Sequence, residues 1–142
     1  MSRKIYFAGS IRGGRDDAEL YAEIIDLLSQ FGQVLTEHVG SNELLETGEE
    51  TLSDEEIFER DMAWLTEADV VVAEVTLPSH GVGYEIGRAR AMGKPILCLY
   101  RRATGHRLSA MLAGDPNLLC EAYAQVAELE PLFTAYFREL VC

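Results

Sequence analysis

The sequence has little positive charge. It contains 12 Lys and Arg residues against 24 Asp and Glu residues, which gives a formal net charge of -12 at pH 7. Proteins that hold long nucleic acids present a broad excess of Lys and Arg to the phosphates. We therefore expect no nucleic acid polymer as a partner, although a short basic loop can still hold one small anion.

The sequence also lacks long apolar runs. No stretch of roughly 18 or more apolar residues is present, so we expect no membrane-spanning helix and no membrane partner. The first four residues lead straight into a short strand-like segment, which is not the pattern of a signal peptide. These absences predict a cytoplasmic protein, or also a nuclear one if the source is eukaryotic.

Cysteine is scarce as well. Cys98, Cys120 and Cys142 are the three cysteines, and their spacing is not that of a metal site. An odd count gives no disulfide framework either. Cys98 lies inside an apolar strand-like segment, where we expect it to be a small core residue.

The length and the order of patterns predict one α/β domain covering residues 1–142. With 48% hydrophobic and 25% charged residues, the composition is that of a globular protein. Apolar strand-like runs alternate with helical patterns, which is typical of βαβ units around a mostly parallel sheet. We expect five strands, at residues 4–9, 33–36, 70–75, 95–100 and 118–123. We expect helices at residues 17–31, with Gly32 as a left-handed cap, 53–68, 83–92 and 125–140, and a loop at residues 40–51.

Glu85 follows the most apolar of these strands. In open α/β sheets, ligands bind outside the carboxyl ends of the strands, and a carboxylate in the first turn of the next helix points into that crevice. Neighbouring glycines such as Gly81 leave room for a ligand against the backbone. If Glu85 faces a substrate, we expect it to act as a nucleophile or as a base.

A glycine-rich basic loop follows the first strand. Backbone amides, one hydroxyl and two guanidinium groups before a helix form a natural anion site. The loop lacks the Gly-Lys-Ser/Thr ending of a P-loop and the GxGxxG spacing of a dinucleotide fold, so ATP and NAD are not favoured. A monophosphate suits it better, with a plain turn carrying solvated arginines as the alternative. The loop residues are Ser10, Ile11, Arg12, Gly13, Gly14 and Arg15.

Asp61 lies beside the predicted buried stripe of the helix at residues 53–68. An isolated Asp at such an edge is more often paired with a cation, here Arg60, than used in chemistry. With Glu85 expected near the same sheet edge, the two carboxylates can divide the nucleophile and acid roles. The stripe consists of Ile57, Phe58, Met62 and Leu65.

Several segments together resemble a known family. Residues 6–15, 34–39, 61–65, 68–76 and 78–85 are similar to the 2'-deoxynucleoside 5'-phosphate N-hydrolases of the nucleoside 2-deoxyribosyltransferase superfamily. The likeness is collinear from Lys4 to about Met111, and beyond that it is a likeness of pattern only. It implies a single-domain, Rossmann-like or flavodoxin-like three-layer sandwich with a five-stranded parallel sheet. It also implies a homodimer that cleaves the bond between base and sugar in 2'-deoxynucleoside 5'-monophosphates without metal or cofactor.

The resemblance also implies roles for single residues. Glu85 would attack the anomeric carbon and form a glycosyl-enzyme ester, Asp61 would help the base to leave, and Tyr6 would hydrogen-bond and position Glu85. Ser109 would reach the phosphate of the neighbouring subunit's site, and His38 would lie against the base. The remaining substrate-binding set is Ser10, Ile11, Arg12, Gly13, Gly14, Arg15, Ser79, Gly81 and Met111.

Three alternatives stay open at this point. A deoxyribosyltransferase would share Glu85, Asp61 and Tyr6, but an enzyme for free nucleosides has no use for the basic loop. A ribonucleotide N-hydrolase acting on CMP differs only in how it treats the 2' position. A non-catalytic nucleotide-sensing module would use the loop to bind phosphate and Glu85 to hold a ribose hydroxyl. For single residues, Tyr6 can be a core aromatic and Ser109 the cap of a short helix.

Overall fold

The carboxyl edge of a parallel sheet organises the molecule. In this computed structural model the described residues are 2–10, 17–37, 52–102, 105 and 107–140, and within them five strands form one sheet in the order β2-β1-β3-β4-β5. All neighbouring strands are parallel. This is the flavodoxin-like order, whose topological switch point lies between β1 and β3. The strands are β1 (Lys4–Ala8), β2 (Gln33–Val34), β3 (Val70–Glu74), β4 (Ile96–Tyr100) and β5 (Leu119–Ala122).

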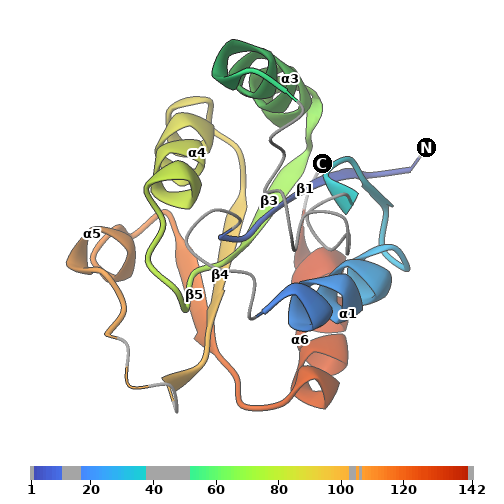
Figure 1. The fold of residues 1–142 in the computed structure, drawn as a ribbon. Coiled ribbons are helices and arrows are strands. Elements are labelled where there is room, and N and C mark those ends of the chain that lie inside the picture. Colours follow the sequence, from blue (N-terminus) through green and yellow to red (C-terminus); the bar gives the residue numbers. More distant parts are fainter. Residues whose placement is uncertain (1, 11–16, 38–51, 103–104, 106, 141–142) are drawn as a thin grey trace.

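Helices cover both faces of the sheet and produce three layers (Figure 1). On one face lie α1 (Ala18–Leu28) and α6 (Leu129–Glu139), the latter entered through the short 3-10 helix η3 (Val126–Glu128). On the other face lie α3 (Asp54–Glu67) and α4 (His80–Ala91). The short helix α5 (Ala110–Ala113) precedes β5. The predicted three-layer α/β sandwich with five parallel strands is confirmed.

Within the described ranges, none of the helices has the length and apolar character needed to cross a membrane.

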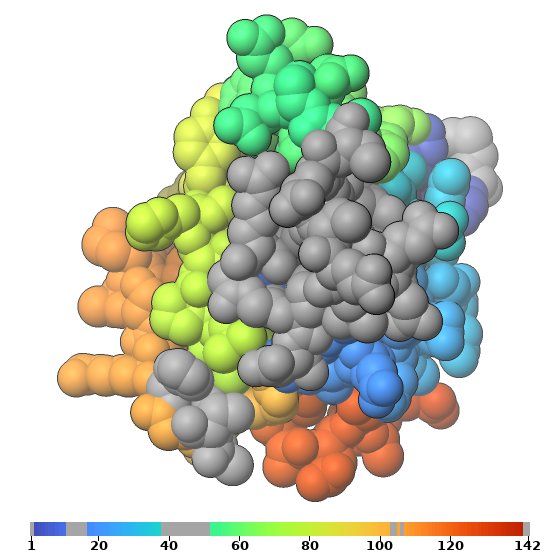
Figure 2. Space-filling model, viewed as in Figure 1, coloured from blue at the N-terminus to red at the C-terminus, as the bar shows by residue number. Residues whose placement is uncertain are grey.

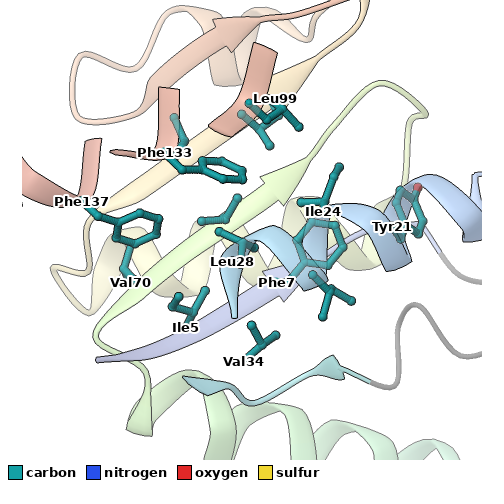
Figure 3. Close-up of a cluster of buried hydrophobic side chains, with 14 of the residues drawn as sticks. Ile5, Phe7, Tyr21, Ile24, Leu28, Val34, Val70, Leu99, Phe133 and Phe137 are labelled. Carbon is teal, nitrogen blue, oxygen red and sulfur yellow. The ribbon is translucent and has the colours of Figure 1, made fainter. Parts of the chain in front are cut away.

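Two buried clusters lie on opposite faces of the sheet, because successive strand residues point in opposite directions. Phe7 and Val72 pack against α1 and α6, with Phe133 of α6 among their neighbours (Figure 3). Tyr6 and Ala73 pack against α3 and α4. All of β3 is buried, as the continuous apolar run predicts for a central parallel strand. The residue parity of β1 therefore places Tyr6 on the face that carries α4.

The strand β2 is shorter than the predicted span of residues 33–36. It ends at Val34, and the side chain of Thr36 then takes over part of its pairing with β1. The Thr36 hydroxyl accepts a hydrogen bond from the backbone N–H of Phe7 at 2.8 Å and donates one to the Phe7 carbonyl at 2.7 Å. A buried side chain thus satisfies backbone groups that a longer strand would otherwise pair.

Capping side chains determine where two of the helices begin. The predicted cap at Ser53 is confirmed as a capping box, in which Ser53 Oγ accepts from the Glu56 N–H at 3.1 Å and Glu56 Oε1 accepts from the Ser53 N–H at 3.0 Å. The helix α4, however, begins at His80 and not at residue 83, because Ser79 caps it. Glu85 therefore lies in the second turn, and the expectation of a first-turn position was wrong.

The end of α1 also differs from the prediction. The helix ends at Leu28, and Gly32 is not a left-handed cap, since the described glycines with positive φ are Gly93 and Gly105. The reason for glycine is steric: a Cβ atom at position 32 would lie 2.3 Å from the Arg3 carbonyl oxygen. The chain passes this close because the next residue's N–H bonds to the same carbonyl at 2.8 Å.

The predicted buried stripe of α3 is only partly correct. Leu65 is fully buried, whereas Ile57 and Met62 are half-buried. Phe58 is 47% exposed and packs its ring against Tyr84 of α4, with the ring centroids 6.0 Å apart. The fully buried contacts of α3 come at its carboxyl end, so its first turns face the neighbouring helix and solvent.

The close approach at Gly32 gives a stability prediction. Gly32→Ala should lower the free energy of unfolding by roughly 1–3 kcal/mol, because the added methyl forces β1 and the chain before β2 apart. Gly87→Ala is the matched control: nothing lies within 4 Å of a Cβ there, and alanine should gain up to about 1 kcal/mol in this exposed helical position. Urea unfolding of both variants measures the two effects. Equal stabilities for the two variants would contradict the steric explanation.

Candidate active site

The centre of the candidate site is the contact between Tyr6 and Glu85. Tyr6 on β1 is 1% exposed, and its hydroxyl donates a hydrogen bond to Glu85 Oε2. Glu85 lies on α4, which packs on the face of the sheet to which Tyr6 points. The expected hydrogen bond between these two residues is therefore present, at the switch point between β1 and β3 where ligands of such sheets bind.

The surroundings of Tyr6 keep its hydroxyl protonated. Burial raises the pKa of Tyr6 far above its ordinary value of 10.0, and the negative charges of Glu85 and Asp61 raise it further, against the opposing charge of Arg60. At neutral pH the hydroxyl can only donate to the carboxylate. Asp61 and Glu85 thus both raise the pKa of the same phenol.

Asp61 on α3 is the third member of this group. Its side chain is 20% exposed, and its Oδ1 lies 3.0 Å from both Nε and Nη2 of Arg60. The Arg60 guanidinium in turn lies over the Trp64 ring, 4.9 Å from the centroid. The pairing with Arg60 that we weighed as the simpler interpretation is thus present. It coexists with the position near Tyr6, so Asp61 belongs to the candidate site.

The first turn of α4 borders the site. Ser79 is the N-cap, and its Oγ accepts a hydrogen bond from the Val82 N–H at 3.2 Å. A helix N-terminus at the carboxyl edge of a sheet offers N–H groups to an anion. At Gly81, the nearest described atom to an added Cβ would be Ser79 Oγ at 3.9 Å, so the packing of the described residues does not require glycine there.

Ser10 lies directly after β1 and is 1% exposed. Its backbone N–H donates to the Tyr21 hydroxyl at 3.2 Å, while its own buried hydroxyl has no hydrogen-bond partner among the described residues. Buried hydroxyls in proteins are nearly always paired. An unpaired one at this edge fits a side chain that binds a ligand. Of the other expected binding residues, Ile11, Arg12, Gly13, Gly14, Arg15 and His38 lie outside the described residues.

Ser109 and Met111 lie at the start of the short helix α5. Ser109 is its N-cap and accepts a hydrogen bond from the Met111 N–H at 3.2 Å, so the capping role that we weighed is present. Both residues are exposed, and Met111 is 82% exposed. This placement leaves them available to a neighbouring molecule.

A buried polar cluster around Glu74 was not predicted from the sequence. Glu74, inside the apolar run of β3, is buried and bonded to Tyr123 and to Arg101. The signal for it was a lone carboxylate in a segment that is otherwise entirely apolar. As for metals, the described His, Cys, Asp and Glu side chains include no group of three or more that could hold an ion, and the absence of a metal or cofactor stays an expectation.

The chain is similar to known proteins over nearly its whole length. The family described as nucleoside 2-deoxyribosyltransferase matches residues 5–129. A mouse protein named 5-hydroxymethyl-dUMP N-hydrolase is 61% identical over 138 residues, covering 94% of this chain and 79% of the mouse protein.

Two solved structures share the fold. A CMP N-glycosidase from Clostridium botulinum has a TM-score of 0.66 at 20% identity, covering 94% of this chain and 99% of that chain. A 2-deoxyribosyltransferase from Bacillus psychrosaccharolyticus has a TM-score of 0.68 at 18% identity, covering 94% of this chain and 95% of that chain. At such identities the likeness concerns the fold alone.

The raised pKa of Tyr6 gives a prediction for alkaline stability. The folded protein keeps the Tyr6 proton above pH 10, whereas the unfolded chain releases it near the ordinary value, so stability falls as pH rises past about 10. In Tyr6→Phe this loss should be shallower by up to about 1.4 kcal/mol per pH unit, which is the effect of one proton. Urea unfolding between about pH 9 and 11 compares the two slopes. If stability falls equally with pH in wild type and in Tyr6→Phe, the pKa of Tyr6 is not raised in the folded protein.

Proposed function

This chain belongs to the nucleoside 2-deoxyribosyltransferase family, and on that basis we propose that it hydrolyses the N-glycosidic bond of 2'-deoxynucleoside 5'-monophosphates. The products are the free base and 2-deoxyribose 5-phosphate. The observation that carries the proposal is the bond from Tyr6 to Glu85 at the switch point, with Asp61 close by. Since the mouse relative is named for 5-hydroxymethyl-dUMP, that nucleotide is the first substrate to test.

In the proposed mechanism Glu85 is the nucleophile. Departure of the base leaves an oxocarbenium-like sugar, and a carboxylate beneath the anomeric carbon stabilises that charge and can trap it as an ester. A sugar without a 2'-hydroxyl reaches this state more easily. Because the Tyr6 hydroxyl holds Oε2, the carboxylate is oriented before substrate arrives. Water then hydrolyses the ester and releases 2-deoxyribose 5-phosphate.

Asp61 has the role of acid in this mechanism. The leaving base carries developing negative charge, which a proton donated or relayed by Asp61 neutralises. Two carboxylates near one phenol can take different roles when their surroundings differ. Here Glu85 accepts a hydrogen bond from the neutral Tyr6, whereas Asp61 pairs with the cationic Arg60, so their surroundings differ. Because a neighbouring cation favours the ionised form of a carboxylate, we assign Asp61 the relay of a proton to the leaving base.

The 5'-phosphate supplies binding energy away from the reacting bond. We assign its binding to Ser10, Arg12, Gly13 and Arg15 of the loop after β1 and to Ser79 at the start of α4. The buried, unpaired hydroxyl of Ser10 and the capped N-terminus of α4 support this assignment. Fixing the phosphate holds the sugar over Glu85, which can raise the rate as well as the affinity.

We further propose that the enzyme is a homodimer whose Ser109 completes the neighbouring site. Side chains of α3, α4 and α5 lie along one side of the molecule (Figure 2), and apolar side chains there are exposed: Phe58 by 47%, Tyr84 by 49% and Met111 by 82%. The rings of Phe58 and Tyr84 adjoin, with their centroids 6.0 Å apart, and contiguous exposed apolar surface marks interaction sites. Ser109 belongs to the same surface, next to Met111.

The nucleophile assignment is tested by base release. Wild-type protein should release base from 5-hydroxymethyl-dUMP or dGMP, and Glu85→Gln should lose at least about 10³-fold in rate because no ester can form. Glu55→Gln, an exposed carboxylate in the first turn of α3, is the matched control and should keep full activity. Chromatography of the free base measures the rates.

The same assay separates the alternatives. Equal release from free deoxyguanosine would contradict a role for the phosphate, and release from CMP at the same rate would indicate a ribonucleotide hydrolase. Transfer of deoxyribose to an added base would indicate a transferase. Binding of the nucleotide without any release would indicate a sensing module.

The shared site is tested by mixing two defective proteins. Glu85→Gln and Ser109→Ala chains, each weak alone, should regain roughly a quarter of wild-type activity on exchange at equal amounts, because about half of the dimers are mixed and each has one intact site. Substrate well below KM makes the Ser109→Ala defect visible. A mixture no more active than the mean of its two components, with dimers shown by light scattering, would place Ser109 outside the neighbouring site.

A further inference from the structure

The connection from β3 to α4 is anchored at Thr76. This residue is 4% exposed and ends the buried run that begins in β3. Its backbone N–H donates to Glu74 Oε1 at 2.8 Å. Its hydroxyl oxygen accepts the backbone N–H of Arg101 at 3.0 Å and lies 3.4 Å from the Arg101 Nε. Both the backbone and the side chain of Thr76 are therefore bonded to groups at the carboxyl ends of β3 and β4.

The Thr76 hydroxyl takes the place of a backbone acceptor between these two strands. The Val75 N–H donates to the Leu99 carbonyl at 2.9 Å and continues the parallel ladder. In a regular ladder the Arg101 N–H would next donate to the Val75 carbonyl. It donates to the Thr76 hydroxyl oxygen instead. The chain thus leaves the sheet from a residue whose side chain is still bonded to the β4 side.

The groups that hold Thr76 are themselves held. Glu74 is 1% exposed, and its Oε2 accepts the Tyr123 hydroxyl. The Arg101 Nε lies 3.4 Å from the same oxygen, and the Arg101 Nη2 donates to Asp17 Oδ2 at 2.5 Å. A charge is tolerated at the depth of Glu74 only when it is paired and hydrogen-bonded, and both conditions are met. Thr76 is therefore attached to a buried and mutually bonded cluster.

Only two residues separate Thr76 from Ser79, the N-cap of α4, and Figure 1 shows this connection between the end of β3 and the helix. One of them is Pro78, whose ring fixes its own φ and restricts Leu77 to extended conformations. Ser79 is bonded to the helix in turn, since its Oγ accepts the Val82 N–H at 3.2 Å. Because the connection is short and stiff, the position of Thr76 constrains where Ser79 lies.

We propose that Thr76 is a positioning residue for the 5'-phosphate, acting through Ser79 at the start of α4. The inference rests on the proposed function, because it takes Ser79 as a contact of that phosphate. The Ser79 oxygen accepts from Val82, and its hydroxyl can still donate to a phosphate oxygen. A donor held in place before the ligand arrives loses less conformational entropy on binding. Glu85, in the second turn, is oriented by Tyr6, so Thr76 acts on phosphate affinity more than on the chemical step.

Four variants separate the hydroxyl from the rest of the residue. Thr76→Val keeps the shape and removes the oxygen that binds the Arg101 N–H, whereas Thr76→Ser keeps that oxygen. Pro78→Ala keeps the hydrogen bonds of Thr76 but loosens the connection. Thr134→Val is the matched control, because Thr134 is exposed on α6, across the sheet from α4, and its hydroxyl donates to the Glu130 carbonyl at 2.9 Å.

The experiment compares ligands with and without the phosphate. KM and kcat are measured on 5-hydroxymethyl-dUMP, and calorimetry gives the dissociation constants of 2-deoxyribose 5-phosphate and of the nucleoside 5-hydroxymethyl-2'-deoxyuridine. We expect Thr76→Val to raise KM and the sugar phosphate constant about 10-fold, with kcat within about threefold and the nucleoside constant within about twofold of wild type. Pro78→Ala should raise the same two constants about threefold. Thr76→Ser and Thr134→Val should remain close to wild type.

Several outcomes overturn the inference. A lower thermal midpoint with unchanged phosphate affinity would give Thr76 a stabilising role only. Equal losses of affinity for the sugar phosphate and for the nucleoside would indicate a general disturbance of the site. Binding by Thr76→Ser as weak as that by Thr76→Val would show that the hydroxyl is not the group that matters. If Thr76→Val fails to fold, Pro78→Ala decides alone: a selective loss of phosphate affinity supports the inference, and unchanged affinity refutes it.

Failure of the proposed function gives a different result, because wild type would then release no base. If wild type still binds 2-deoxyribose 5-phosphate and Thr76→Val weakens that binding selectively, the positioning role stands. Wild type that does not bind the sugar phosphate refutes it.

Discussion

The pairing of β1 with β3 is the constraint on which the carboxyl edge of the sheet depends. Ile5 to Ala8 pair in register with Val70 to Ala73, so each β1 residue shares a face with its β3 partner. A shift by one residue would turn every side chain to the opposite face. The burial of alternating apolar residues therefore also decides that Tyr6 meets α4 and its Glu85. One register of β1 against β3 therefore determines both the packing of the core and the geometry of the candidate site.

The sheet divides two carboxylates between its faces. Glu85 and Glu74 each accept a hydrogen bond from a tyrosine hydroxyl, Tyr6 in one case and Tyr123 in the other. Glu74 is fully buried and also faces Arg101, whereas Glu85 is only half-buried and lies beside the switch point. A fully buried carboxylate with a fixed cation suits structure, and one held by a neutral donor at an accessible edge suits chemistry.

Local sequence patterns predicted the strands well, because strands that are buried on both faces have short, continuous apolar sequences. Such patterns could not predict features that depend on contacts between segments distant in sequence. Gly32 was interpreted as a cap, although its reason is the carbonyl of Arg3 beside it. The early start of α4 was hidden by its glycines, whose poor helix propensity is outweighed by the cap at Ser79. The ion pair of Arg101 with Asp17 joins positions that share no local pattern. Of the candidate site, the sequence pattern placed Glu85 and Asp61 near one edge, whereas the position of Tyr6 beside Glu85 and the roles of all three rest on the family resemblance.

The stacking of Arg60 on Trp64 has a practical consequence. Trp64 is the protein's single tryptophan, and the guanidinium above its ring is the one bonded to Asp61. Cation contact with an indole face depends on where the charge sits. Any ligand that draws Arg60 or Asp61 toward itself will change the surroundings of this one indole. The fluorescence of Trp64 therefore reports on ligand binding one helical turn from Asp61, the candidate acid, and no other tryptophan contributes to the signal.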